Sequence, residues 1–219
     1  MVAAGVKGLA MEVSSHALAL HRVDGIDWDV AVFTNLTQDH LDFHGTLEAY
    51  RRAKRRLFEL LALSPKHDRW AIINGDDPAG TSMVEGLGLR TLTYGFRPAA
   101  RVHPLEYAST LDGIRMAVET PSGRLDVASP LIGEHNVMNL LAACGVGVAL
   151  GMEPSMIRRA LETVAAVPGR FERVEAGQPF LVVVDYAHTP DALERVLRTA
   201  RKLTRGRLGV VFGCGGDRD

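Results

Sequence analysis

The residue whose surroundings most suggest chemistry is Lys54. A helix is expected from Thr46 to Leu63, and four apolar residues line one of its faces at helical spacing. They are Leu47, Tyr50, Leu57 and Leu61. Lys54 lies in the middle of that face. Its amine either reaches along the apolar surface to water, or is partly desolvated, with a lowered pKa, and reacts with carbon dioxide to give a carbamate, an anionic metal ligand.

A second group of chemical side chains lies upstream of that helix. The polar segment 35–44 reads NLTQDHLDFH and places two aspartates and two histidines within six residues. It follows an expected buried strand at 29–34, so it can bind a hard metal ion or a phosphate. The alternative is a capping loop in which Asp39 or Asp42 begins a helix.

Glu12 is the third candidate. It closes a short apolar segment, 7–13, that is expected to form a buried strand, and α/β sheets bind ligands at such strand ends. A single carboxylate is only suggestive. Ser14 and Ser15 then offer N-caps to a short helix that runs through Leu20.

Composition limits the classes of function. The chain of 219 residues is 47% hydrophobic and 23% charged, as in globular proteins. A net charge of −1 without a long basic run gives nucleic-acid binding little support. The two cysteines, Cys144 and Cys214, are far apart and suit a reducing cytoplasm. No signal peptide is evident in 1–20, and no apolar run approaches the ~20 residues that cross a membrane.

The elements that must position these residues predict an α/β fold. A mostly parallel sheet flanked by helices, with a small antiparallel part, should be followed after Pro168 by a second α/β unit. Further strands are expected at 70–74, 180–185 and 208–212, hairpins within 91–127, and helices at 134–150, 154–164 and 189–202. Both ends look cut, because the strand at 7–13 needs parallel neighbours and the turn at 213–216 has no helix after it.

The sequence has no phosphate-binding loop of the form GxxxxGK[ST] and no nucleophile elbow. The turn at 213–216, GCGG, is only weakly similar to a dinucleotide-binding fingerprint. The residues alone therefore predict an α/β enzyme that handles metals and anions.

Seven motifs in series resemble the Mur ligases, and among them the type that adds the third amino acid to the peptidoglycan precursor peptide. The motifs are EVSSHAL (12–18), NLTQDHLD (35–42), AK (53–54), GEHNVMN (133–139), VPGRF (167–171), DYAHTPD (185–191) and FGCGGDRD (212–219). The resemblance implies that 1–167 is the central ATP-binding domain without its phosphate loop. It implies that 168–219 begins the Rossmann-like C-terminal domain, whose specificity segment would follow. The family's N-terminal uridine-binding domain would precede the chain.

The resemblance also implies two Mg²⁺ ions. Glu12 matches the carboxylate that holds one ion beside the ATP phosphates. His40 matches a ligand of the second ion. Lys54 matches a lysine whose N6-carboxylated form supports that second ion.

Nucleotide contacts follow in the same way. Asn136 matches the adenine-side asparagine, and Asn139 supports the same helix start. Arg170 and Asp185 match nucleotide contacts at the junction of the two domains.

Three residues match contacts to the other substrates. Ser14 and Arg22 match contacts to the UDP-muramoyl dipeptide, and Arg218 matches an arginine that meets the carboxylate of the incoming amino acid. Leu20 departs from the pattern, because some relatives carry a polar contact there.

The activity implied is ATP-dependent amide ligation through an acyl phosphate, in a cytoplasmic monomer. The incoming diamino acid is expected to be meso-diaminopimelate, with lysine and ornithine left open. The rivals are cyanophycin synthetase, folylpolyglutamate synthase and a non-catalytic metal-binding relative, whose mark would be a lost Glu12, His40 or Lys54. Without a phosphate loop, the chain by itself is expected to be inactive.

Overall fold

The computed structural model describes residues 3, 5–37, 41–164 and 167–213. The chain divides into two compact units, Met1–Ala100 and Arg101–Asp219. This division lies elsewhere than the domain boundary expected near Pro168, which stays a prediction.

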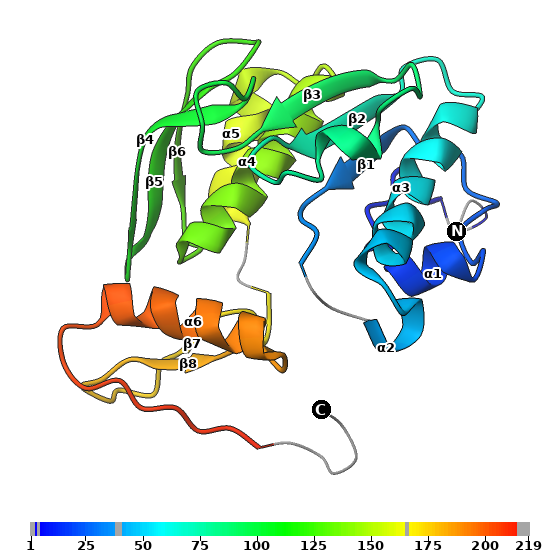
Figure 1. Ribbon diagram of the computed structural model, residues 1–219. Coiled ribbons are helices and arrows are strands. Elements are labelled where there is room, and N and C mark those ends of the chain that lie inside the picture. Colours follow the sequence, from blue (N-terminus) through cyan, green and yellow to red (C-terminus); the bar gives the residue numbers. More distant parts are fainter. Residues whose placement is uncertain (1–2, 4, 38–40, 165–166, 214–219) are drawn as a thin grey trace. The chain divides into compact units, whose positions relative to one another are not determined.

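The first unit is built on a parallel sheet with the order β1-β2-β3. Helix α3 runs along one face of this sheet, and the short helices α1 and α2 lie beside α3 (Figure 1). The bounds are α1 (Ser15–Ala19), β1 (Val30–Phe33), α2 (Leu41–His44), α3 (Leu47–Leu63), β2 (Trp70–Asn74), η2 (Thr81–Met83) and β3 (Arg90–Tyr94).

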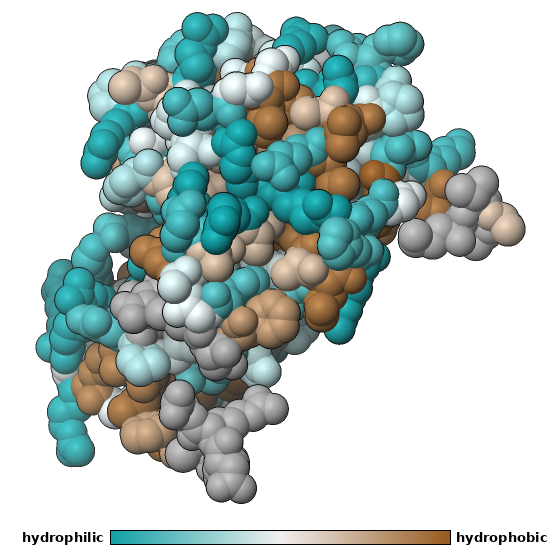
Figure 2. Space-filling view, turned by 45° about the vertical axis from the view of Figure 1, so that its right-hand side comes forward, coloured by the Kyte–Doolittle hydropathy of each residue, from teal (hydrophilic) through white to brown (hydrophobic). Residues whose placement is uncertain are grey.

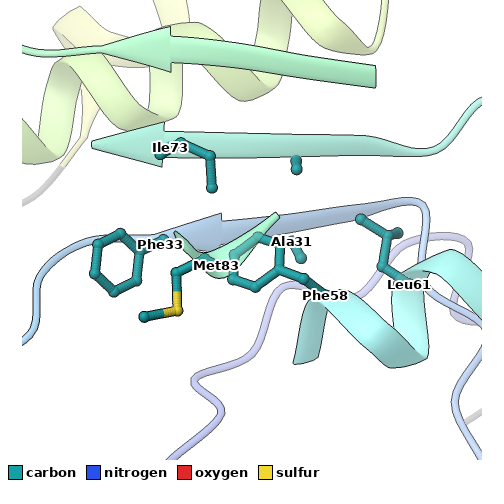
Figure 3. Close-up of a cluster of buried hydrophobic side chains, with 7 residues drawn as sticks. Ala31, Phe33, Phe58, Leu61, Ile73 and Met83 are labelled. Carbon is teal, nitrogen blue, oxygen red and sulfur yellow. The ribbon is translucent and has the colours of Figure 1, made fainter. Parts of the chain in front are cut away.

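The core of the first unit lies between α3 and the sheet. Phe58 and Leu61 of α3 meet side chains of β1 and β2, and Met83 of η2 lies between Phe33 and Phe58 (Figure 3). The sheet residues are Ala31, Phe33, Ala71 and Ile73. All seven side chains are buried, so removing this surface from water is what holds α3 on the sheet.

Local signals explain where these helices begin. Ser14 caps α1 by accepting from the Ala17 amide, and Thr46 caps α3 by accepting from the Ala49 amide. Both caps match the expectation from the sequence.

The second unit begins with an antiparallel sheet in the order β4-β5-β6, as expected for the hairpin region. Helix α5 packs on β6, and α4 contacts α5 and β4. Burial raises the pKa of the Cys144 thiol in α4 to about 12, so this cysteine is an inert part of the core. The bounds are β4 (His103–Thr110), β5 (Gly113–Glu119), β6 (Leu125–Ser129), α4 (Glu134–Ala149) and α5 (Pro154–Thr163).

The last part of this unit contains a two-stranded antiparallel hairpin and one helix, capped by Thr189. A small cluster of Ile132, Phe171 and Ala200 joins this helix to the segment before α4. The bounds are β7 (Glu172–Val174), β8 (Val182–Val184) and α6 (Pro190–Leu203).

Three expectations were wrong. The segments 7–13 and 208–212 form no strand, and their apolar side chains, such as Leu9 and Phe212, are exposed. A strand needs a ladder partner, and within the described residues neither segment has one. Residues 91–94 belong to the parallel β3 and not to a hairpin.

The described residues contain no helix long and apolar enough to cross a membrane. The face in Figure 2 shows brown apolar side chains interspersed among teal hydrophilic ones.

Candidate functional site

Lys54 is half-buried on the inner side of α3, one helical turn after Tyr50. Its Nζ lies 5.2 Å from the centroid of the Tyr50 ring. The apolar face is as expected at Tyr50 and Leu61, but Leu47 is 49% exposed and Phe58 is the central buried residue. The packing partners explain this pattern, because Phe58 and Leu61 pack against the sheet whereas Tyr50 stacks on His44 of α2.

Aromatic and imidazole rings connect α1, α2 and α3 next to Lys54. His44 Nε2 lies 2.9 Å from Ser15 Oγ, and the His44 ring stacks on Tyr50 with centroids 5.2 Å apart. The His16 and Phe43 rings are tilted by 38° to each other, with centroids 4.2 Å apart. The sequence placed His44 in a candidate loop, whereas its contacts show that it joins the three helices.

Of the other two candidate metal ligands, Glu12 and His40, the structure describes only Glu12. Glu12 is exposed in a segment without secondary structure, and not at the end of a buried strand. His40 lies outside the described residues. In the described ranges, no three His, Cys, Asp or Glu side chains are close enough to share a metal ion.

Arg22 follows α1 in a tightly closed turn. Its amide donates to the Ala17 carbonyl at 2.9 Å, and the His21 amide donates to Leu18 at 3.2 Å. This pair of bonds is the Schellman ending of a helix. Within the part that the structure describes, the Arg22 guanidinium forms no hydrogen bond, and it is exposed to a ligand. Ser14 by contrast uses its hydroxyl to cap α1.

At the end of β2 the sequence predicted only a turn. It did not predict that two polar side chains there, Asn74 and Asp77, bond other segments. Asp77 accepts from the Leu36 amide through Oδ2 and from the Ala79 amide through Oδ1, both at 2.8 Å. Asn74 donates to the Thr34 carbonyl at 2.6 Å. These two side chains hold the segment that leaves β1 toward the candidate His40.

We expect Asp77→Ala to destabilise the first unit by about 1–3 kcal/mol, because two backbone donors lose their acceptor. Asp68→Ala is the matched control. Its carboxylate is 85% exposed in a pair with Arg90, and its removal should change stability by no more than about 0.5 kcal/mol. Chemical denaturation of both variants measures the difference, and equal effects would contradict the role of Asp77.

In the second unit, the asparagines mark the start of α4. Asn136 donates to the Ile132 carbonyl at 2.8 Å and accepts from the Asn139 amide group at 3.1 Å. Gly133 stands at the N-cap with φ +97°, where a Cβ would lie 2.6 Å from the His135 ring. The two asparagines therefore brace this helix start around a glycine that no other residue could replace without strain.

Arg170 and Asp185 lie on two neighbouring segments. Asp185 accepts from the Phe171 amide at 2.7 Å and from the Ala187 amide at 2.8 Å. The Arg170 guanidinium carbon lies 5.4 Å from the centroid of the Tyr186 ring, which is 63% exposed. Sequence reasoning named Arg170 and Asp185 but missed Tyr186, whose ring beside a guanidinium could stack on a planar base.

Backbone strain coincides with two of the candidate arginines, Arg22 and Arg170. In the described residues, only His21 (φ 56°) and Phe171 (φ 49°) have positive φ without being glycine. His21 precedes Arg22, and Phe171 follows Arg170. Such conformations cost of order 1–3 kcal/mol and tend to gather at functional sites. Arg218 lies outside the described residues.

Comparison with known families matches both parts of the chain. The Mur ligase middle domain covers residues 1–147, and the family described as "Mur ligase, glutamate ligase domain" covers residues 169–219. The chain belongs to the Mur ligase family.

Individual curated relatives narrow the similarity to one type of Mur ligase. It is 48% identical over its whole length to the UDP-N-acetylmuramoyl-L-alanyl-D-glutamate--2,6-diaminopimelate ligase of Solibacter usitatus, of which it spans 44%. It is also 48% identical to the ligase of that name from Bacillus licheniformis, of which it spans 45%. A solved structure with the same name matches 94% of this chain and 42% of its own, with a TM-score of 0.75 and 37% identity. The chain thus spans less than half the length of these relatives.

Proposed function

We propose that this chain is the ATP-handling part of a ligase that joins meso-diaminopimelate to UDP-N-acetylmuramoyl-L-alanyl-D-glutamate in peptidoglycan biosynthesis. The observation that carries the proposal is the 48% identity to ligases of that name over the whole chain. A complete ligase here means this chain within a protein of the full length of its relatives.

The chemistry is a phosphoryl transfer followed by an acyl transfer. A carboxylate oxygen of the substrate attacks the γ-phosphorus of ATP, and ADP leaves. The amine of the diamino acid then attacks the acyl carbon, loses a proton and displaces inorganic phosphate. Both steps bring anions together, so cationic and polar side chains must hold them.

In the first unit, we assign Arg22 to an anionic group of the muramoyl dipeptide, because its exposed guanidinium stands on a rigid turn. Ser14 would contribute through the turn that it caps rather than through its hydroxyl. Lys54 would carry the carbamate. The oxygens of that carbamate and of Glu12 belong to the donor class that Mg²⁺ prefers, with His40 as a further ligand. Two such ions would neutralise charge on the triphosphate and on the carboxylate.

In the second unit, we assign Arg170 and Tyr186 to the nucleotide, with Asp185 as the residue that fixes both. Asn136 and Asn139 hold the start of α4 on the adenine side. Arg218 would clamp the carboxylate of the incoming amino acid. We place the boundary of the two domains near Pro168 and expect a cytoplasmic monomer.

The test is phosphate release by the complete ligase with ATP and the muramoyl dipeptide. Diaminopimelate, lysine and ornithine are supplied in turn. We expect release only when an amino acid is present, and fastest with diaminopimelate. Preference for lysine or ornithine would reject the assigned substrate, and no release with any of them would reject the ligase activity.

A further inference from the structure

The turn that carries Arg22 is tied to α3 by a cluster of three side chains. Asp24 Oδ2 lies 2.6 Å from Arg56 Nη2 and 2.7 Å from His21 Nδ1. Arg56 belongs to α3, two residues after Lys54, while His21 and Asp24 flank Arg22 on both sides. Arg22 therefore lies between two residues, His21 and Asp24, whose side chains both contact Arg56 on α3.

The three contacts cannot all be hydrogen bonds at the same time. His21 Nδ1 also lies 2.9 Å from Arg56 Nη2, which is a hydrogen bond only if Nδ1 carries no proton. A bare Nδ1 would then face the Asp24 carboxylate with its lone pair. With a proton on Nδ1, His21 and Arg56 both donate to Asp24 Oδ2, and the 2.9 Å contact between Nδ1 and Nη2 then joins two donors and is not a hydrogen bond. Accordingly, the hydrogen bond from His21, followed by the Arg56 guanidinium, holds the pKa of Asp24 below its ordinary value.

His21 occupies a backbone position that usually belongs to glycine. It is the residue after the C-cap of α1, with φ 56°. A side chain here costs energy that glycine would avoid, and a strained residue beside a ligand contact points to a function. Glycine could make the turn but could not bond Asp24.

The stability of the fold does not explain why these contacts are present. The Asp24 and Arg56 side chains are 34% and 30% exposed, and pairs at that level of exposure contribute little to folding. A defined position for the guanidinium of Arg22 relative to α3 matters more, because small displacements of a substrate contact reduce catalysis strongly.

We propose that His21, Asp24 and Arg56 are positioning residues that fix Arg22 toward the muramoyl dipeptide. This inference rests on the proposed role of Arg22 as a substrate contact. The three residues act through Arg22 and touch no substrate themselves.

The test measures KM for the muramoyl dipeptide, ATP and diaminopimelate in the complete ligase, with Tm for each variant. Asp24→Asn and Arg56→Gln should raise KM for the muramoyl dipeptide at least about fivefold and leave the other two within about twofold. Glu48→Gln is the matched control, because the Glu48–Arg51 pair has the same 2.6 Å contact but lies wholly within α3.

His21→Gly separates positioning from stability. Glycine relieves the strain at φ 56°, so Tm should not fall, yet KM for the muramoyl dipeptide should rise as in Asp24→Asn. A Tm loss without this rise in KM would overturn the proposal, because it would show a purely structural cluster.

The Arg22→Ala variant tests the substrate contact of Arg22 separately from the positioning role of the cluster. If it leaves KM for the muramoyl dipeptide unchanged, the substrate contact itself is wrong and the positioning proposal falls with it. If it raises that KM, Asp24→Asn should add nothing further in the double variant, because the cluster acts only through Arg22. Additive effects, or an Asp24→Asn enzyme that behaves like Glu48→Gln, would reject the positioning role alone.

Discussion

Ligation by the complete ligase should fall to background in the Lys54→Ala variant, a loss of at least about 100-fold in kcat. The variant removes the only atom that can carry the proposed carbamate. Short-chain carboxylic acids should partly restore activity by supplying oxygens at the vacated position. Rates of phosphate release with and without added acid measure both effects.

Lys54→Arg decides between a carbamate and a structural cation. The Tyr50 ring, whose centroid lies 5.2 Å from the Lys54 Nζ, suits a cation at this position. A guanidinium keeps the charge and forms no carbamate, so the variant should be as inactive as Lys54→Ala. Arg52→Ala, an exposed cation on the same helix, should remain active. An active Lys54→Arg enzyme would show that Lys54 forms no carbamate and merely extends its amine to water.

The second large effect concerns the core that supports Lys54. Phe58→Ala should destabilise the first unit by about 3–5 kcal/mol, because the ring is 1% exposed between α3 and the sheet. Thermal unfolding should show a Tm lowered by roughly 6 °C or more.

Leu63→Ala is the control for Phe58→Ala. Leu63 ends the same helix and is 81% exposed, so the Tm of this variant should stay close to that of the parent protein. Similar losses for both variants would contradict the role of burial against the sheet, because Ala is the better helix former at both positions.

The sequence by itself determined the features that depend on near neighbours. The caps at Ser14 and Thr46 were readable because each hydroxyl bonds an amide three residues later. The antiparallel strands β4, β5 and β6 and the helix α4 also followed from local patterns, whereas residues 91–94 belong to the parallel sheet. The family followed from seven short motifs whose order needs no coordinates.

Only the tertiary structure decided which residues meet across the chain. Asp77 bonds the amide of Leu36, 41 positions away, and Arg56 bonds Asp24 across 32 positions. No local pattern encodes such pairs, because the sheet and α3 bring their partners together. The segments 7–13 and 208–212 also show that a local pattern is not sufficient. Both have strand-like sequences, but a strand forms only where a neighbouring strand accepts its hydrogen bonds.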